Sequence, residues 1–333
     1  SCINLKQVHG FVKLLRHILD LVSPEVLLLT ETNVPHEENI SYFGKNGDEA
    51  QIVYNFTLPP LLLYTFHQED SSVFNNWLEG MDFSSKKKMF LNFTASHDGI
   101  GVRPLEGIVS KENVKTLIEI VNKNGAEISY KRNPDGSQSP YELNITYIDA
   151  LRNPSEGAED PFLVEKFIAS QGLMLSLPGL PAIYVHSLFG TLNWYKGVKK
   201  TKRSRTINRK KLNFNLIKKK ISNKDTIEYK VYSKYLNLLK IRKKIKAFHP
   251  SSKFKIIKKD KNLICFYRFY KDSGLYCLIN ISTKNLTYDF SCFNFKNKKW
   301  RDLINGDIIK SNEFSFKPYQ IRWIVNKRTI RKE

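Results

Sequence analysis

Two acidic side chains follow apolar runs in the first hundred residues of this 333-residue sequence. Glu31 comes directly after Leu27–Thr30, and Asp98 follows Phe90–Ser96 with His97 just before it. Catalytic groups of a (β/α)8 barrel lie at the carboxyl ends of its strands, and paired carboxylates carry out glycoside chemistry. The spacing is therefore typical of acid–base work on a sugar. The competing interpretation is that Glu31 and Asp98 are helix caps or loop ligands.

Apolar runs and helical patterns alternate through residues 1–98. Val8–Leu21 has apolar residues at helical spacing, and Leu58–Phe66 predicts a second helix. Val26–Leu29, Ile52–Tyr54 and Met89–Phe93 are short continuous apolar runs, which predict strands buried on both faces. Strands that alternate with helices indicate an α/β fold with a parallel sheet.

Residues 99–162 interrupt this alternation and predict an inserted, loop-rich subdomain. Turn signals at Asn133–Gly136 and Asn153-Pro154 surround one helix, at about 110–123, and one strand-like run, Tyr141–Tyr147. The barrel pattern returns over 163–246. There we expect a helix over Pro161–Ser176, a fourth buried strand at Ala182–Val185 and a basic amphipathic helix over about 227–246.

From residue 247 to 333 the apolar period drops to two. Strand-like runs cover Leu263–Tyr267, Leu275–Ile279, Tyr288–Phe295 and Phe314–Trp323, with turn residues between them. This pattern predicts a small antiparallel all-β domain at the C-terminal end.

The net charge of +22 is divided unevenly along the chain. Residues 1–190 hold 15 Lys and Arg against 23 Asp and Glu, whereas residues 191–333 hold 39 against 9. A half that basic suits nucleic acid or an anionic membrane surface, but no nucleic-acid motif is present. We therefore interpret it as solvated surface and expect no specific nucleic-acid or membrane partner.

Cysteine usage and hydropathy indicate a protein of the reducing cytoplasm. Four cysteines without a CxxC pair suggest neither a disulfide scaffold nor a zinc site. The longest uncharged apolar stretch, near Leu173–Phe189, contains two prolines, a glycine and a histidine, which makes it a poor membrane span. The histidines show no ligand spacing, so we expect no metal.

Three segments resemble consecutive strand ends of glycoside hydrolase family 13, the α-amylase family. They are Leu28–Asn33, Asn92–Gly101 and Pro178–Tyr184. The His-Asp-Gly-Ile-Gly form of the second segment, together with Asn144–Tyr147 and Arg205–Arg209, is similar to the sucrose phosphorylase branch.

Within that branch, two further segments look most like the glucosylglycerate phosphorylases. One is Glu31–Gly44, and the other is Asn133–Ser137 leading into Ser139–Asn144. The resemblance runs from residue 1 to about 250 and continues weakly to Tyr319-Gln320.

The resemblance implies a retaining double displacement that moves a glucosyl unit from glucosylglycerate or sucrose to phosphate, without a cofactor. Glu31 would be the general acid/base. Asp98 would be the third family carboxylate, which grips the glucosyl hydroxyls, and His97 and Arg209 would contact the same unit. Three residues of the inserted segment would bind substrate on the acceptor and phosphate side: Tyr141, Glu142 and Asn144.

The family nucleophile, an Asp in an Arg-x-Asp-Ala context, is absent from the 333 residues. The family pattern places Ser1-Cys2 shortly after the strand that carries it, and the chain does not begin with Met. We therefore expect a portion with barrel strands five to seven in 1–98, the insertion in 99–162, strand eight and closing helices in 163–246, and the β domain in 247–333. The missing half barrel would be needed for completeness, and the isolated portion would be inactive.

Two other functions remain open from the sequence. One is an α-glucosidase or transglycosylase of the same family, because water, phosphate and sugar acceptors compete for one covalent intermediate. The other, from a different class, is an inactive fragment or a basic binding protein, motivated by the missing nucleophile and the charge of residues 191–333.

Overall fold

A computed structural model describes residues 3, 5–81, 88–291 and 300–326. Cys2, Cys292 and the end of the expected strand Tyr288–Phe295 lie outside the described residues. The two described cysteines, Cys265 and Cys277, are buried and form no disulfide with each other. Within the described residues, no helix is long and apolar enough to cross a membrane.

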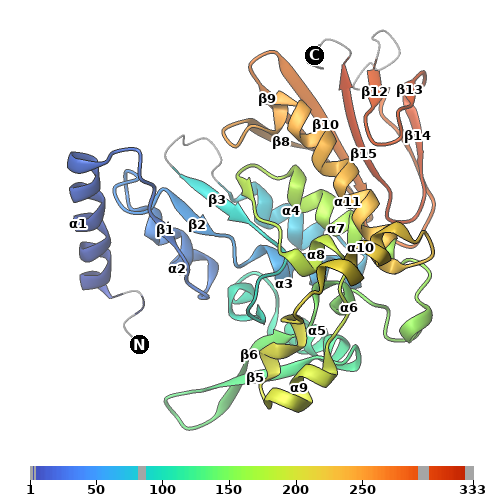
Figure 1. Ribbon diagram of the computed structural model, residues 1–333. Coiled ribbons are helices and arrows are strands. Elements are labelled where there is room, and N and C mark those ends of the chain that lie inside the picture. The colour runs from blue at the N-terminus through green and yellow to red at the C-terminus, as the bar shows by residue number, and fades with distance from the viewer. Residues whose placement is uncertain (1–2, 4, 82–87, 292–299, 327–333) are drawn as a thin grey trace.

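A parallel four-stranded sheet positions the candidate site (Figure 1). Its strands lie in the order β1 (Leu29–Thr30), β2 (Ile52–Tyr54), β3 (Met89–Asn92) and β7 (Leu180–Pro181). All three neighbouring pairs are parallel, with Thr30 opposite Val53 in the first of them. The expected parallel sheet is confirmed, and the carboxyl ends of all four strands face the same edge.

Helices connect and cover these strands. The main ones are α1 (Lys6–Val22), α2 (His36–Ile40), α3 (Leu58–Gln68), α4 (Ser72–Glu79), α7 (Leu163–Ser176), α8 (Val185–Leu188), α9 (Tyr195–Thr201), α10 (Phe214–Ser222) and α11 (Ile227–Lys244). Local signals set several of the ends. The side chain of Thr226 accepts a hydrogen bond from the Tyr229 backbone N–H and caps α11. The first turn of α3 contains two prolines, whose missing N–H groups would have no partner within the helix at that position.

Two expected strands are wrong in extent. Of Val26–Leu29, only Leu29 belongs to β1, and Leu27 and Leu29 are 56% and 42% exposed rather than buried. The expected strand Ala182–Val185 begins and ends earlier, as β7, and Val185 opens α8. Both β1 and β7 are edge strands of the described sheet, so each lacks a partner on one side that would extend and bury it.

The inserted segment contains the expected helix, α5 (Lys111–Lys123), and a three-stranded sheet in the order β4 (Ile100–Gly101), β6 (Gln138–Asn144), β5 (Glu127–Arg132). The turn predicted at Asn133–Gly136 joins β5 to β6, and Gly136 takes a φ of 84° there. Strand β5 was not expected, although Ile128 and Tyr130 alternate with polar residues there, because the run is short and none of its residues is buried.

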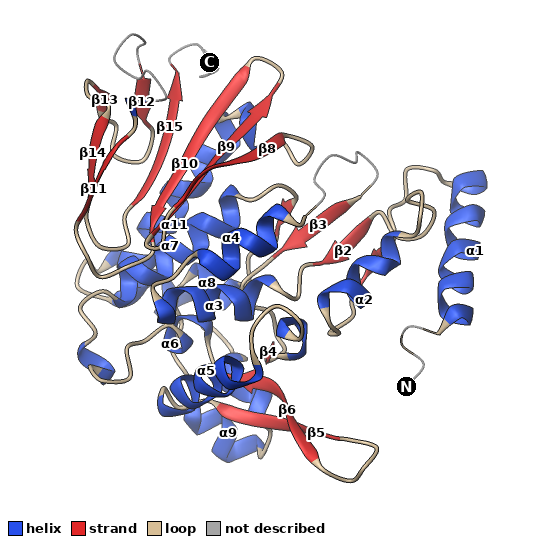
Figure 2. Ribbon diagram, turned by 180° about the vertical axis from the view of Figure 1, so that it is seen from behind, coloured by secondary structure: helices blue, strands red, loops and turns tan. Residues whose placement is uncertain are grey.

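The C-terminal region is antiparallel, as expected. Its larger sheet has the order β13-β12-β15-β10-β9-β8, and β11 pairs with β14. The strands are β8 (Lys253–Lys259), β9 (Leu263–Tyr270), β10 (Ser273–Asn280), β11 (Leu286–Asp289), β12 (Trp300–Asp302), β13 (Ile308–Ile309), β14 (Glu313–Phe316) and β15 (Ile321–Asn326). Figure 2 shows this sheet packed above α7 and α11.

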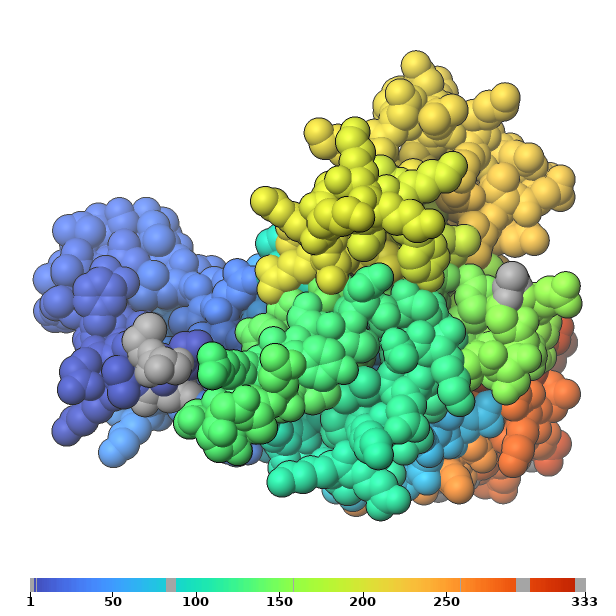
Figure 3. Space-filling model, turned by 90° about the horizontal axis from the view of Figure 1, so that it is seen from below, coloured from blue at the N-terminus to red at the C-terminus, as the bar shows by residue number. Residues whose placement is uncertain are grey.

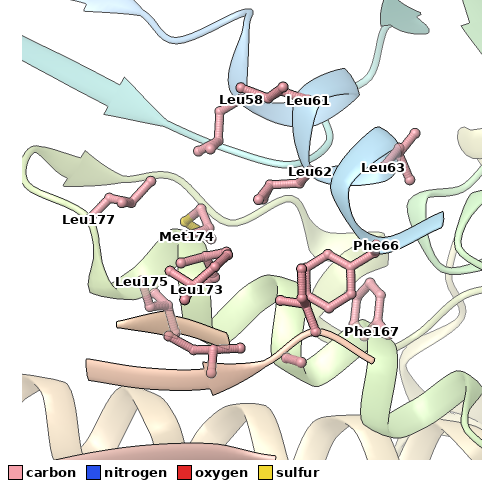
Figure 4. Close-up of a cluster of buried hydrophobic side chains, with 14 of the residues drawn as sticks. Leu58, Leu61, Leu62, Leu63, Phe66, Phe167, Leu173, Met174, Leu175 and Leu177 are labelled. Atoms are coloured by element: carbon pink, nitrogen blue, oxygen red, sulfur yellow. The ribbon is translucent and has the colours of Figure 1, made fainter. Parts of the chain in front are cut away.

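One hydrophobic core runs from the helices of the parallel sheet into the C-terminal region. Leu58, Leu62 and Phe66 of α3 face Phe167 and Met174 of α7 (Figure 4). On the other side, the fully buried Arg268 of β9 donates to the carbonyls of Ser176 and Leu177 at the end of α7, each at 2.9 Å. The domain boundaries given above remain predictions, since the core is continuous across them.

Candidate active site

Glu31 and Asp98 lie at the same edge of the parallel sheet. Glu31 follows β1 directly, and Asp98 lies in the loop after β3, two strands away. Strand axes two apart are separated by about 10 Å, which leaves room for a sugar ring between them. Glu31 is exposed. Burial, together with the charge of Glu31, raises the pKa of Tyr54 at the end of β2.

Asp98 is held by two guanidinium groups. Its Oδ1 accepts from Arg205 Nη1 at 2.7 Å and from Arg209 Nη2 at 3.0 Å. The ring of His97, whose side chain is 66% exposed, lies 3.7 Å from the same oxygen. The structure therefore brings together His97, Asp98 and Arg209, which the sequence predicted for the glucosyl side.

The segment that carries these arginines also holds the loop after β3. It is the short helix η4 (Ser204–Asn208) with Arg209 next to it. Asn208, which is buried, donates from Nδ2 to the carbonyls of Ser96 and Asp98 at 3.2 and 2.9 Å. Arg209 Nε donates to the His97 carbonyl at 2.5 Å. The position of Asp98 thus depends on a segment about a hundred residues downstream.

Glu142 forms a bidentate pair with Arg205. Arg205 Nε and Nη2 donate to the two carboxylate oxygens at 3.0 and 2.7 Å, and the Glu142 side chain is 5% exposed. Burial raises the pKa of Glu142, and Arg205 partly offsets that rise. Burial lowers the pKa of Arg205, but the bonds and charges of Glu142 and Asp98 outweigh it, so the net shift is upward. The paired guanidinium is a permanent cation.

Two glycines let β4 approach the site closely. A Cβ on Gly101 would lie 2.3 Å from Asn33 Oδ1, and one on Gly99 would lie 2.9 Å from the Cβ of Glu142. These separations are too short for any side chain, which explains the two glycines after Asp98. They let the start of the inserted segment pack against Glu142 of its own strand β6 and against the loop that follows Glu31.

Two predicted substrate-binding residues have different positions. Tyr141 lies in the middle of β6 and is partly exposed. Asn144 is fully buried, and its Nδ2 donates to the Glu127 carbonyl and to Ser129 Oγ, both at 2.8 Å. In this structure the Asn144 amide ties β5 to β6, and the substrate contact expected of it stays a prediction.

Arg205 is the site residue that sequence reasoning missed. It bridges Asp98 and Glu142, yet no role was predicted for it from the sequence, although it opens the segment Arg205–Arg209. One signal could have found it. The chain carries no carboxylate between Glu165 and Asp225, so a cation in this stretch can find its counterion only in another segment.

The described residues contain no group of three or more His, Cys, Asp or Glu side chains arranged to hold a metal. What the site offers is one exposed carboxylate, Glu31, and across the sheet edge an Asp98–Glu142 pair neutralised by two arginines. That arrangement can supply a proton-transferring acid on one side and fixed, charged hydrogen-bonding groups for hydroxyls on the other.

Comparison with known proteins identifies relatives over nearly the whole chain, although no protein-family model matches it. Glucosylglycerate phosphorylase of Escherichia coli (strain K12) is 38% identical over 325 residues, which are 97% of this chain and 57% of that protein. Glucosylglycerate phosphorylase of Spirochaeta thermophila is 44% identical over 284 residues, 84% of this chain and 48% of the relative. Sucrose phosphorylase of Streptococcus mutans is 26% identical over 255 residues, 76% of this chain and 49% of the relative.

A solved structure has the same fold. Sucrose 6F-phosphate phosphorylase from Thermoanaerobacter thermosaccharolyticum matches with a TM-score of 0.72 at 22% identity, over 95% of this chain and 57% of that one. An α-amylase from H. orenii matches with a TM-score of 0.63. The chain therefore spans about half the length of the relatives it matches.

Proposed function

The chain is homologous to the glucosylglycerate phosphorylases and, more distantly, to sucrose phosphorylases within glycoside hydrolase family 13, and on that premise we propose that it supplies the acid/base side of a retaining glycoside phosphorylase site. The enzyme would transfer a glucosyl unit from glucosylglycerate to phosphate through a covalent glucosyl–enzyme intermediate. Barrel strands five to eight would correspond to β1, β2, β3 and β7.

Glu31 is proposed as the general acid/base. It would protonate the leaving glycosidic oxygen and then accept a proton from the incoming phosphate. The exposed position of Glu31 after β1 leaves its carboxylate open to such an exchange. The nucleophilic aspartate is proposed to come from a first half barrel that is not among these 333 residues.

Asp98, with His97 and Arg209, is proposed to bind the hydroxyls of the glucosyl unit. Asp98 Oδ1 already accepts from both arginines, which fixes the carboxylate plane and leaves Oδ2 for substrate. Such preorganised charged donors and acceptors stabilise an oxocarbenium-like transition state because they need no rearrangement during the reaction.

The single observation that carries the proposal is the convergence at one sheet edge of residues from three distant segments. The loop after β3, strand β6 and helix η4 meet in the Asp98–Arg205–Glu142 and Asp98–Arg209 contacts, on the same edge as Glu31. A basic binding protein has no need of two carboxylates paired with its arginines.

The test is Glu31→Gln in the complete enzyme that carries these residues. Glutamine keeps the shape but transfers no proton, so phosphorolysis of glucosylglycerate should fall by about 10²–10⁴-fold. Glucosyl fluoride needs no protonation of its leaving group, so its first step should be largely spared. Glu37→Gln, on the exposed surface of α2, is the matched control and should change neither rate.

The products decide between the functions left open by the sequence. Glucose 1-phosphate indicates a phosphorylase, whereas free glucose or a new glycoside indicates a hydrolase or transglycosylase. Equal losses with glucosylglycerate and glucosyl fluoride, or no loss with either, would show that Glu31 is misassigned. A cytoplasmic location and independence from cofactors remain predictions.

A further inference from the structure

A basic hollow of about 520 Å³ lies where helix α11 ends beside the turn between β9 and β10. Figure 1 shows this end of α11 next to β9 and β10, at the upper side of the molecule, with β5 and β6 of the inserted segment at the lower side. Figure 3 shows the lower face, where the green inserted segment lies against the yellow segment near residue 200. The hollow is therefore separate from the candidate active site. No carboxylate is among its described lining residues, and its cations are Arg242, Lys243, Lys244, Lys246 and Lys271.

Two guanidinium groups at the hollow are withdrawn from solvent without a counter-ion. Arg268 of β9 is fully buried, and its donors are used by backbone carbonyls and by Ser252 Oγ. Arg242 is partly buried and donates from Nε to the Leu175 carbonyl at 3.0 Å and from Nη2 to the Phe248 carbonyl at 3.3 Å. Among the residues that the structure describes, neither guanidinium has a carboxylate within ion-pair distance.

The two guanidinium groups share one aromatic neighbour. The central carbon of each lies over the ring of Phe248, at 5.4 Å for Arg242 and 5.7 Å for Arg268. Burial, with a smaller contribution from the charge of Arg242, lowers the pKa of Arg268 to about 9. Burying a cation without a counter-ion costs free energy, so an anion bound in the hollow would reduce that cost.

Two exposed lysines add charge to the wall of the hollow. Within the described part of the chain, neither Lys243 nor Lys271 lies within ion-pair distance of a carboxylate. Lys246 is paired with Asp272 at 3.2 Å, so those two side chains sum to zero. The C-terminal end of α11 contributes roughly half a negative charge, which offsets only a small part of the remaining cations.

Lys271 occupies a backbone conformation that favours glycine. It is the first residue of the two-residue turn between β9 and β10, and its φ is 54°. Glycine is the usual residue where such a turn needs a positive φ. The ammonium group of Lys271 lies 5.5 Å from the centre of the Tyr270 ring, which is stacked on His249 at 4.0 Å. The lysine is thus kept there at a conformational cost, which a role for its charge explains.

We propose that this hollow binds a phosphate group, either as inorganic phosphate or as part of a sugar phosphate, at a site distinct from the candidate active site. A phosphate dianion presents at least three acceptor oxygens, so it can bond several cationic donors at once. A single carboxylate would neutralise only one of the uncompensated cations. The inference goes beyond the proposed function and does not depend on it.

The test is calorimetric titration of the 333-residue chain with inorganic phosphate and with glucose 1-phosphate. Lys271→Gly removes an ammonium group but keeps the backbone conformation, so phosphate affinity should fall about tenfold while the melting temperature does not fall. Lys243→Gln, at the end of α11, should weaken binding in the same way. Lys255→Gln is the matched control, because Lys255 is exposed on β8 but does not line the hollow, and it should change the affinity by less than about twofold.

Each outcome decides the question. Tighter binding of glucose 1-phosphate identifies a sugar phosphate as the ligand, and equal or weaker binding identifies the free anion. Phosphate that binds the candidate active site instead would be insensitive to Lys271→Gly and Lys243→Gln, and that result would overturn the site. An equal loss with Lys255→Gln would show diffuse attraction and also overturn it, as would failure of both phosphates to bind. If Lys271→Gly lowers the melting temperature, Lys243→Gln decides alone.

Discussion

Arg205 links two carboxylates that would otherwise repel each other. Asp98 and Glu142 come from separate segments, and both bond the same guanidinium. Two neighbouring carboxylates make each other harder to ionise unless a cation between them offsets the repulsion. Arg205 therefore offsets the repulsion between the two carboxylates, and Arg209 holds Asp98 independently of Glu142.

Glu142→Gln is expected to act through that arginine. The glutamine oxygen can accept one of the two hydrogen bonds from Arg205. Its NH2 group is a donor and would face the second N–H of Arg205, so that bond and the negative charge are lost. We predict that kcat/KM for glucosylglycerate falls about tenfold or more in the complete enzyme, roughly 1.4 kcal/mol. Phosphorolysis of glucosylglycerate and sucrose, measured side by side, checks this.

The control for Glu142→Gln is Glu127→Gln, an exposed glutamate on the neighbouring strand β5, which should leave both substrates unaffected. Glucosyl fluoride should react almost unchanged in the Glu142 variant. A preference for sucrose in the unmodified enzyme, or a preference that Glu142→Gln does not alter, would refute the glucosylglycerate assignment.

The elements around the site are held together by close backbone packing and by a few hydrogen bonds. Strand β4 reaches Asn33 only because Gly101 has no Cβ, and the loop after β3 is held by η4. Helix α3 is fixed in a similar way near its C-terminal end, where His67 Nε2 donates to the Ala150 carbonyl at 2.8 Å. That bond joins a barrel helix to the end of the inserted segment.

The α3–Ala150 connection predicts a pH dependence of stability. Burial, aided by the nearby charge of Lys166, lowers the pKa of His67 from 6.5 to about 4, against the opposing effect of the Ala150 carbonyl. The unfolded chain therefore binds a proton between pH 6.5 and 4 that the folded chain excludes, so stability falls as the pH falls through this window. From pH 7 to pH 5 this should lower the free energy of unfolding by about 2 kcal/mol.

Urea unfolding of the chain and of His67→Gln at the two pH values measures this contribution. Glutamine can keep the donor to Ala150 but does not titrate, and all other groups titrate alike in both proteins. The His67→Gln variant should therefore lose about 2 kcal/mol less than the parent on acidification. Parallel pH profiles for the two proteins would contradict the prediction.

At the scale of the whole molecule, helix α1 presents an open apolar surface. Helix α1 packs Val8 and Val12 against the cluster around Tyr42 and Phe43, but its other face remains exposed. Figure 1 shows α1 at the margin of the molecule, beyond β1. The large apolar side chains exposed on α1 are Phe11, Leu14, Leu15, Ile18, Leu21 and Val22. A contiguous apolar face of this kind is typical of an interface.

The 333-residue chain in isolation should therefore self-associate through α1. The double substitution Phe11→Lys with Leu14→Lys places two charges on the exposed face, where these residues are 59% and 53% exposed, and should shift the chain towards monomer. Sedimentation velocity over a range of concentrations measures this. Phe214→Lys, on α10, is the control, because Phe214 is 76% exposed but far from α1 in sequence.

A monomeric parent chain at all concentrations, or a control as effective as the α1 variant, would show that the α1 face is not the contact. In the complete enzyme we propose that the first half barrel covers this face. There the double substitution should instead lower stability.

The sequence by itself determined the kinds of element and most of their places. Helices such as α1, α5 and α11 and strands such as β3, β9 and β10 lie where apolar periodicity and turn residues predicted them. Periodicity and capping act between near neighbours, so they can be read from one chain. The positions of Glu31 and Asp98 after parallel strands were also predictable, because strand ends share one edge of the sheet.

Tertiary structure alone decided how far edge strands extend and which charges meet. Strand β1 is shorter than its apolar run and β7 ends before its run begins, and each lacks a neighbour on one side of the described sheet. The role of Arg205 became visible only when packing placed Asp98 and Glu142 beside it, and the bonds of the Asn144 amide to β5 were equally invisible in the sequence. Such pairings join residues far apart in the chain, and an ion pair or a buried amide leaves no periodic signal in the sequence that would identify its partner.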